Sequence, residues 1–424
     1  MKRYSRRQTL VMSSALVPGS LLAGATRATG KARVVVVGGG FGGASAARTL
    51  HRIAPEMDVT LIVDADRFST CPFSNLVIAG EIPLSQITFG YDKLAAEGVK
   101  VLQGRAVEVD AARKVIRLED GRDLAFDRAI LSPGIDLKFT AIPGYNAAAA
   151  DKMPHAWKAG EQTILLRDQI AAMPQGGTFV MTVPNNPYRC PPGPYERASL
   201  VAFSLSKTNP TARILIIDGK DSFSKQSLFK EGWEHLYPGM ITHVPFAENG
   251  GVLEVVPETL EVVTAFETFK GDVVNVIPPQ SAAEVALNSG LAAGGDWCQI
   301  DQATFESPHA PGVHVLGDAA IVGDMPKSGF SASVQGSVCA HVVAALLRDE
   351  DVPGGVLLNT CYSFVAPDYG ISVAGVYRVT EDGKLAATKG AGGTSPVGAG
   401  DEVRLSEADF ARSWYATLTG NLFL

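Results

Sequence analysis

The chain has 424 residues, of which 46% are hydrophobic and 44 are glycine. This length predicts two or three domains, and the abundance of glycine favours an α/β protein with many tight turns. The formal net charge is −7, which provides no basic surface, so we expect no nucleic-acid partner.

The first 30 residues are typical of a twin-arginine export signal. Two arginines in Ser5-Arg-Arg-Gln-Thr-Leu10 precede an apolar stretch over residues 10–25, and small residues such as Ala28 then offer cleavage sites. We therefore assign residues 1–30 to the signal and expect the mature chain in the periplasm. The alternative is a cytosolic protein with a chance pair of arginines. No later apolar run is long enough to span a bilayer, so we expect no transmembrane segment in the mature chain.

A dinucleotide-binding βαβ unit is predicted directly after the signal. Residues 31–37 form a short apolar strand, the glycine motif G-x-G-x-x-G follows at 38–43, and an alanine-rich helix is expected over 44–53. A second strand at 59–63 ends in an acid that can bind ribose hydroxyls. The alternative is a packing turn without a ligand. The predicted binding residues are Gly38, Gly40, Gly43 and Asp64.

Two later segments indicate FAD rather than NAD in this first unit. Residues 312–320 resemble the strand and acidic turn with which flavoproteins that bind two dinucleotides hold FAD. Residues 127–134 resemble the crossover segment of the same superfamily, although they end Ser-Pro-Gly rather than the usual Ala-Thr-Gly. We therefore expect a discontinuous FAD domain at 31–145 and 285–355. Its further binding residues are Gly134, Gly317 and Asp318.

The region 146–284 is predicted to be a second Rossmann-like domain without a phosphate loop. A strand at 178–183 and an amphipathic helix at 198–206 enclose a turn, residues 184–196, that carries five prolines and Cys190 instead of glycines. Prolines remove amide donors and stiffen the chain, so this turn cannot cradle a pyrophosphate. The strand at 213–218 still ends in an acid. NAD(P)H is therefore not expected as the reductant.

Five cysteines and seven histidines occur in the chain. In an oxidising compartment disulfides persist, and an odd number of cysteines leaves at least one that is unpaired or bonded to something other than sulfur. Cys298 and Cys339 lie in apolar surroundings and are interpreted as packing residues. The histidines show no metal-ligand spacing, so no metal is assigned.

These residues resemble the flavoprotein subunit of flavocytochrome c sulfide dehydrogenase over essentially the whole chain. The most specific stretches are Cys71-Pro-Phe-Ser-Asn75, Tyr188 to Arg197, Lys225 to Trp233 and Met325-Pro-Lys-Ser-Gly329. The resemblance implies an α/β fold with two Rossmann-like, glutathione-reductase-like domains and a C-terminal α+β flavin-binding and interface domain at 356–424.

The resemblance also implies roles for individual side chains. Cys71 matches a cysteine bound to FAD through a thioether, the alternative being an ordinary free or buried cysteine. Cys190 and Cys361 match a redox-active disulfide, the alternative being a structural one. Glu196 matches a carboxylate near the flavin, but an acid at a helix N-terminus would look the same. Lys327 and Trp414 match residues close to the flavin. The alternatives are a solvated loop lysine for Lys327 and a core or interface tryptophan for Trp414.

The implied activity is oxidation of hydrogen sulfide to zero-valent sulfur or polysulfide, with electrons passed to a c-type cytochrome subunit. No C-x-x-C-H sequence occurs, so the haem must belong to that partner. Three alternatives remain: a sulfide:quinone oxidoreductase, an enzyme acting on another thiol, and a flavin-holding accessory protein of a sulfur-oxidation complex.

Overall fold

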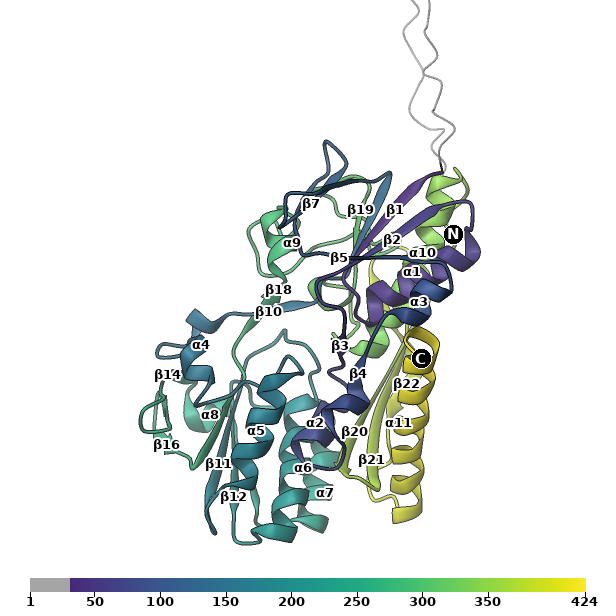
Figure 1. The fold of residues 1–424 in the computed structure, drawn as a ribbon. Helices are drawn as coiled ribbons and strands as arrows, with labels where there is room; N and C mark the ends of the chain where they lie inside the picture. Colours follow the sequence, from purple (N-terminus) through teal and green to yellow (C-terminus); the bar gives the residue numbers. More distant parts are fainter. Residues whose placement is uncertain (1–30) are drawn as a thin grey trace, which may run out of the picture.

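The computed structural model describes residues 31–424, and the predicted export signal at residues 1–30 lies outside the described residues. Two parallel β-sheets lie one above the other in Figure 1, and a third, antiparallel sheet runs along their side. The predicted fold class, α/β with two Rossmann-like sheets and a C-terminal α+β unit, is confirmed.

The first sheet has the strand order β19-β9-β1-β2-β5, and all its neighbours are parallel. Its strands are short and apolar because they are covered on their faces, and four of the five residues of β1 are buried. The late strand β19 completes a sheet whose other strands come from the first part of the chain. The strands are β1 Arg33–Val37, β2 Asp58–Val63, β5 Lys100–Gln103, β9 Arg128–Leu131 and β19 Val313–Val315.

Two helices, α1 (Phe41–Ile53) and α10 (Gly329–Leu347), pack closely beside this sheet. A Cβ atom at Gly336 would lie 2.2 Å from the carbonyl oxygen of Gly42, so the two helices touch at glycines. Helix α10 begins at Gly329 because the hydroxyl of Ser328 accepts a hydrogen bond from the N–H of Ser331 and so caps the helix. Within residues 31–424, α10 alone has the length and hydropathy of a membrane span; 56% of its apolar window is buried, as in a core helix.

The second sheet has the order β13-β12-β11-β17 and is also parallel. Helix α6 (Gly193–Thr208) follows β11 and begins inside the segment predicted to be a loop. A proline is tolerated in the first turn of a helix, where its missing N–H has no partner to lose, and Pro194 occupies that turn. The strands are β11 Thr178–Val183, β12 Arg213–Asp218, β13 Ile241–Val244 and β17 Val273–Val276.

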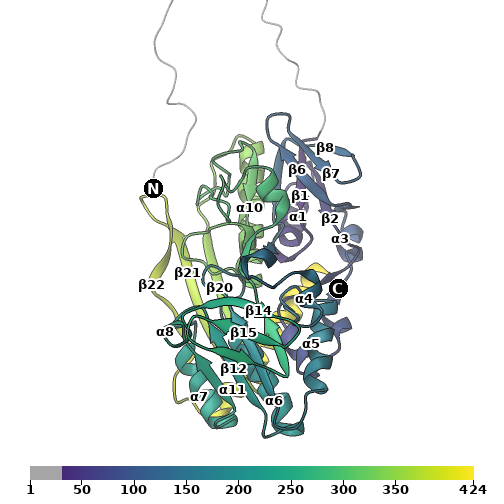
Figure 2. The same ribbon diagram turned by 90° about the vertical axis from the view of Figure 1, so that its left-hand side faces the viewer.

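The third sheet and the last helix connect the two parallel sheets. The long strands β20 (Val356–Ala366), β21 (Tyr369–Val379) and β22 (Leu385–Thr394) pair in order, and α11 (Asp401–Leu422) packs against them. Figures 1 and 2 show this sheet running along both halves of the molecule. Strand β20 contacts α10 beside the first sheet and α6 and α7 (Gln226–Leu236) beside the second. It is therefore placed to bring a side chain into the space between them.

The remaining elements are short. A two-stranded antiparallel pair, β10 with β18, joins the regions of the two parallel sheets, and two small antiparallel sheets, β6-β7-β8 and β14-β15-β16, flank them. The strands are β3 Phe68–Ser69, β4 Thr88–Phe89, β6 Ala106–Asp110, β7 Val115–Leu118, β8 Asp123–Ala125, β10 Ile135–Leu137, β14 Val252–Val256, β15 Glu261–Thr264, β16 Thr268–Lys270 and β18 Gln280–Ala282. The α-helices are α2 Ser74–Ile78, α3 Asp92–Ala96, α4 Ala147–Ala150, α5 Glu161–Ala171, α8 Phe246–Asn249 and α9 Glu284–Asn288, and the 3₁₀ turns are Leu84–Ile87, Phe139–Ala141 and Gly317–Ala319.

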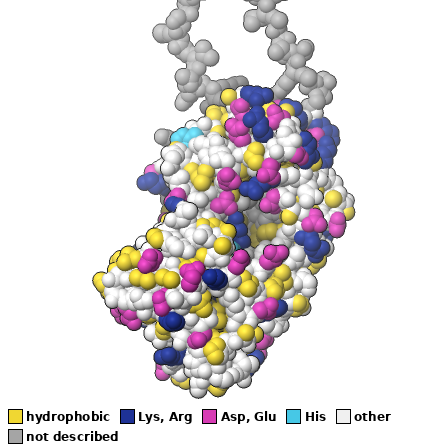
Figure 3. Space-filling view, turned by 60° about the vertical axis from the view of Figure 1, so that its left-hand side comes forward, with side chains coloured by type: hydrophobic (Ala, Val, Ile, Leu, Met, Phe, Trp, Pro, Cys, Tyr) yellow, Lys and Arg dark blue, Asp and Glu magenta, His cyan; other side chains and the backbone are white. Residues whose placement is uncertain are grey.

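The face drawn in Figure 3 carries acidic and basic side chains side by side and is hollowed near its centre, where hydrophobic side chains gather. This mixture of charges agrees with the absence of a basic footprint in the sequence.

Two buried histidines make the stability of the fold depend on pH. Burial lowers the pKa of His155 to about 3 and that of His314 to about 4. Both folded-state values lie below the unfolded value, so the unfolded chain binds more protons below pH 6.5. Their contribution is therefore complete above pH 6.5 and is lost as the pH falls toward 4. Between pH 7.5 and 5 we expect each histidine to remove about 2 kcal/mol from the free energy of unfolding.

Urea unfolding of the protein over this pH range, read by circular dichroism, checks the expectation. His314→Gln should flatten the pH dependence by about 2 kcal/mol over that range. Its matched control is the exposed His309→Gln, which should leave the dependence as it is. An unchanged slope in His314→Gln contradicts the assignment.

Candidate functional site

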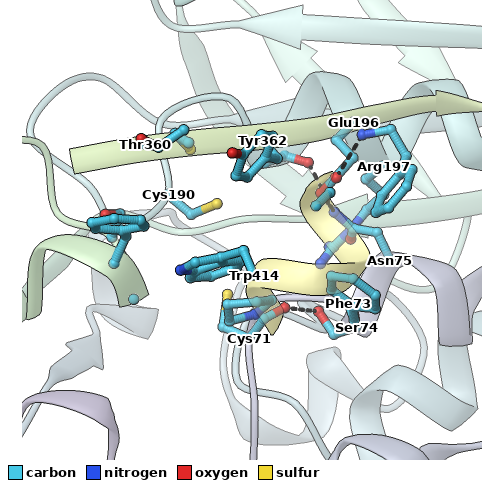
Figure 4. Close-up of a pocket in the computed structure, with 18 of the residues that line it drawn as sticks. Cys71, Phe73, Ser74, Asn75, Cys190, Glu196, Arg197, Thr360, Tyr362 and Trp414 are labelled. Carbon is cyan, nitrogen blue, oxygen red and sulfur yellow. Dashed lines mark hydrogen bonds between the residues drawn. The ribbon is translucent and has the colours of Figure 1, made fainter. Parts of the chain in front are cut away.

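One cavity brings together segments that are far apart in the sequence. Its walls come from residues 71–75 at the start of α2, residues 190–197 at the start of α6, residues 360–364 of β20, and α11. In Figure 4 the labelled side chains of Cys71, Cys190 and Trp414 point into the same space. Five predicted site residues line the cavity: Cys71, Cys190, Glu196, Cys361 and Trp414.

The proline-rich turn holds Cys190 in a fixed and strained position. The backbone of Cys190 is left-handed, with φ 58°, a conformation that a non-glycine residue keeps only where its surroundings impose it. Its N–H donates to the carbonyl of Lys327 (2.8 Å), and its carbonyl accepts from the N–H of Gly193 (2.8 Å). A Cβ atom at Gly193 would lie 3.0 Å from the Cys190 Sγ and 2.9 Å from the Trp157 ring. The turn therefore presents a sulfur at a defined place.

The three cavity cysteines affect one another's acidity. The neighbouring thiol of Cys190 lowers the pKa of Cys71 to about 7, and the neighbouring thiol of Cys71 raises the pKa of Cys190. Burial raises the pKa of Cys361, against the opposing positive charge of Lys225. All three are free thiols in this structure, and the Cys190–Cys361 disulfide stays a prediction about the oxidised protein. Cys71 is the readiest of the three to form a thiolate at neutral pH.

Glu196 lies in the first turn of α6, but both of its oxygens are held by other elements. Its Oε1 accepts from the N–H of Phe364 on β20 (2.9 Å), and its Oε2 accepts from the side-chain amide of Asn75 (2.8 Å). Burial raises the pKa of this carboxyl, and the two hydrogen bonds oppose the shift. A carboxyl whose pKa is raised in this way is suited to proton exchange nearer neutral pH. The geometry thus favours the site interpretation over that of a simple helix-terminal acid.

Arg197 lines the cavity, although the sequence alone indicates no role for it. It is 2% exposed, and its guanidinium donates to the side-chain oxygens of Asn75 (3.1 Å) and Asn275 (2.9 Å) and to the carbonyls of His155 (3.0 Å) and Ala156 (2.6 Å). Because Asn75 in turn holds Glu196, the arginine fixes one wall of the cavity. A charged residue at the start of the apolar face of an amphipathic helix is the sequence feature that could have indicated a buried role.

The glycine motif is built as expected for an anion site. The backbone of Gly38 has φ 100°, and a Cβ atom at Gly43 would lie 1.9 Å from the Gly38 carbonyl oxygen, so both positions require glycine. Helix α1 starts directly after Gly40 and has no side-chain cap, which leaves its first N–H groups available. Asp64 follows β2 and is exposed.

Comparison with known proteins identifies the family of the chain. Three family descriptions match it: pyridine nucleotide-disulphide oxidoreductase at residues 32–165, sulfide dehydrogenase (flavocytochrome c) flavoprotein chain, central, at 163–278, and flavocytochrome c sulphide dehydrogenase, flavin-binding, at 353–423. A sulfide dehydrogenase (flavocytochrome c) flavoprotein chain from Chlorobaculum thiosulfatiphilum is 58% identical over 48 residues, which is all of that sequence and 11% of this chain. The chain belongs to the flavocytochrome c sulfide dehydrogenase flavoprotein family.

More distant relatives cover more of the chain. The mitochondrial sulfide:quinone oxidoreductase of Mus musculus is 23% identical over 75% of this chain and 72% of its own length. The structure of the sulfide:quinone oxidoreductase from Aquifex aeolicus superposes with a TM-score of 0.71, at 15% identity, and covers 92% of both chains. The predicted family and fold are therefore confirmed. This is an oxidoreductase of a sulfide-oxidising flavoprotein family, with FAD as its flavin.

The residues around the first sheet fit FAD. One carboxylate oxygen of Asp318 is buried and has no partner within the described residues, as expected of a group that binds a cofactor hydroxyl. Its neighbour Gly317 has φ 71°, and Gly134 has φ 76°. Lys327 is 8% exposed, so it is not a solvated loop lysine; its ammonium donates to the carbonyls of Asp318 (2.8 Å) and Ala320 (2.7 Å). Trp414 stacks on Phe330, with ring centroids 5.8 Å apart.

The corresponding acid of the second sheet is already bound. Asp218, fully buried, accepts hydrogen bonds from the Tyr195 hydroxyl (2.6 Å) and the Lys220 ammonium (2.6 Å) and contacts the His243 ring (3.0 Å). Tyr195 stacks on Phe223 at 3.6 Å between ring centroids. An acid held in this way cannot receive a nicotinamide ribose without breaking the network. The second Rossmann-like unit of this chain thus has parallel strands like the first, while the acid that would bind a ribose is engaged by protein side chains.

Proposed function

We propose that this protein is a periplasmic sulfide dehydrogenase that oxidises hydrogen sulfide to zero-valent sulfur or polysulfide and passes the electrons to a c-type cytochrome subunit. The supporting observation is the convergence of Cys71, Cys190 and Cys361 on one cavity from three distant segments. Two of these sulfurs can form a disulfide, and the third can anchor the flavin. Bound FAD supplies the acceptor for two electrons and allows them to leave one at a time.

The chain's own residues perform the sulfur chemistry in this proposal. A hydrosulfide sulfur attacks one sulfur of the Cys190–Cys361 disulfide, a new S–S bond forms, and the other cysteine leaves as a thiolate with the electron pair of the broken bond. Glu196 can accept a proton from hydrogen sulfide at the cavity wall, because burial raises its pKa. The rigid Cys190 turn keeps the attacked bond exposed to the cavity. Lys327 adds a buried positive charge on the side of the flavin domain.

Anaerobic titration of the purified flavoprotein with sulfide tests the proposal. We expect bleaching of the flavin absorbance, followed by reduction of an added c-type cytochrome. NADH should not bleach the flavin, since Asp218 is engaged by Tyr195 and Lys220. No bleaching by sulfide would favour the accessory protein instead, which would bind its partner without turnover.

Sulfide:quinone oxidoreductase is the second candidate. Helix α11 exposes the apolar side chains of Val403, Leu405 and Phe410, at 41%, 45% and 58%, and such residues could face a membrane. Charged residues of the same helix, among them Asp401, Asp409 and Arg412, lie close to them in the sequence. Decylubiquinone as the acceptor in the same assay separates the candidates: reduction of the quinone and not of the cytochrome contradicts the proposed dehydrogenase.

We further propose that Cys71 carries the flavin through a thioether. The neighbouring Cys190 thiol lowers the pKa of Cys71 to about 7, which makes the nucleophilic thiolate available. Acid-denatured wild-type protein should retain its flavin absorbance, and Cys71→Ser should release all of it on denaturation. The buried Cys339→Ser, outside the cavity, is the control and should retain it. Release of the flavin from the denatured wild-type protein contradicts the attachment.

A further inference from the structure

A buried lysine lies beside one of the two predicted redox cysteines. Lys225 is 6% exposed, and its ammonium donates to the carbonyl oxygen of Cys361 (2.9 Å) and to the hydroxyl of Ser363 (2.8 Å). In the described part of the chain no carboxylate lies within 4.0 Å of this ammonium. Its charge is therefore hydrogen-bonded but not neutralised, which is costly inside a protein unless an anion is formed nearby.

The local structure gives no other reason for a lysine at this position. Lys225 precedes α7 with a left-handed backbone, φ 62°, which is unfavourable for a residue with a Cβ atom. It also occupies the N-cap of that helix, where the helix dipole disfavours a cation. Neither the helix dipole nor solvent stabilises the charge, and the helix offers it a cation–π contact with the Phe229 ring, 5.8 Å from the centroid. From this position the lysine side chain extends to β20, where it donates to the two residues that flank Tyr362.

The charges around the two cysteines are unequal. The charge of Lys225 acts most strongly on Cys361 and less strongly on Glu196 of α6, Cys190 and Glu407 of α11. The negative charge of Glu196 opposes the ionisation of both thiols. The other cation that acts on Cys190 is Arg197, whose guanidinium is already engaged by two carbonyls and two asparagine side chains. A negative charge on sulfur is thus better accommodated at Cys361 than at Cys190.

We propose that Lys225 is a positioning residue that makes Cys361 the thiolate when the Cys190–Cys361 disulfide opens. This inference rests on the proposed sulfide oxidation. The hydrosulfide sulfur bonds to the Sγ of Cys190, the Cys190–Cys361 bond breaks, and its electron pair moves to the Sγ of Cys361. Cys190 then carries the persulfide with the hydrogen of the hydrosulfide. Lys225 thereby sets the order of attack.

Alkylation of the reduced cysteines tests this without any sulfide. The holoprotein is reduced with dithiothreitol, excess reductant is removed anaerobically, and iodoacetamide labelling of each cysteine is followed from pH 5.5 to 9 by peptide mass spectrometry. In the wild-type protein Cys361 should react at lower pH than Cys190. In Lys225→Met the rate at Cys361 near pH 7 should fall about tenfold or more, because the compensating charge is gone.

Two further variants make the test specific. Methionine is unbranched like lysine, so it leaves the strain at φ 62° unchanged, and Lys225→Arg keeps the charge and should preserve most of the Cys361 rate. Lys230→Met removes an exposed lysine of the same helix and should change nothing. An unchanged Cys361 profile in a flavin-loaded Lys225→Met protein overturns the inference, as does an equal loss in Lys230→Met.

The outcome is separable from the proposed function. If sulfide does not bleach the wild-type flavin while Cys361 labelling still depends on Lys225, sulfide oxidation fails and the electrostatic role stands. If sulfide bleaches the flavin and Cys361 labelling is independent of Lys225, only this inference is overturned.

Discussion

Cys190→Ser is expected to reduce the rate of flavin bleaching by sulfide on the order of a thousandfold or more, because a serine cannot form the disulfide on which the proposed mechanism depends. Cys361→Ser should have an equally large effect, since the two sulfurs act as one unit. Stopped-flow absorbance of the oxidised flavin under anaerobic sulfide measures both. Titration of free thiols in the denatured, unreduced proteins adds an independent check, because either variant should expose one thiol more than the wild type.

The matched control is Cys339→Ser. Cys339 is fully buried in α10 and belongs to the core beside the first sheet, away from the cavity cysteines. Replacing it tests whether the loss of any buried thiol slows the reaction through the general stability of the protein. Normal bleaching in Cys339→Ser with none in Cys190→Ser is the expected pattern. Wild-type bleaching in Cys190→Ser would refute the disulfide mechanism.

The features that could be predicted from the sequence are those that short stretches determine. The glycines at 38–43 and the valines of β1 dictate a turn and a buried strand by their own chemistry. The prolines around Cys190 likewise indicate a stiff turn without reference to the rest of the chain. The start of α6 was misplaced because proline is compatible with both a loop and the first turn of a helix.

The parts that could not be predicted depend on contacts between distant residues. Nothing in the sequence around Lys225 says that its ammonium meets β20, and nothing around Cys71 says that its thiol lies in the same cavity as that of Cys190. The two interpretations of Glu196 were equivalent in the sequence because both place an acid in a first helical turn. The structure distinguishes them because Asn75 of α2 and Phe364 of β20 donate hydrogen bonds to the carboxylate.

Arg197→Met is expected to lower the free energy of unfolding by about 3–5 kcal/mol, the largest stability effect we predict for a single side chain. The guanidinium donates to two backbone carbonyls and to two asparagine side chains. Three of these four acceptors would remain buried without a donor, because only the His155 carbonyl also accepts from the side-chain amide of Asn275 (2.9 Å). Its stacking over the Trp157 ring, 5.1 Å from the centroid, would also be lost. Urea unfolding at pH 7.5 measures the difference.

Two variants decide whether this cost comes from the buried network. Arg213→Met removes an exposed arginine at the start of β12 and should change the free energy of unfolding by no more than about 0.5 kcal/mol. Arg197→Lys keeps the charge but loses the planar set of guanidinium donors, so its free energy of unfolding should lie between those of Arg197→Met and the wild type. If Arg197→Met does not fold, Arg197→Lys should still fold. Loss of Arg197 also frees Asn75, and with it one of the two hydrogen bonds that hold Glu196. Folded Arg197→Lys should therefore show slower bleaching by sulfide as well as lower stability, and wild-type values for both would mean that the guanidinium holds neither the fold nor the cavity wall.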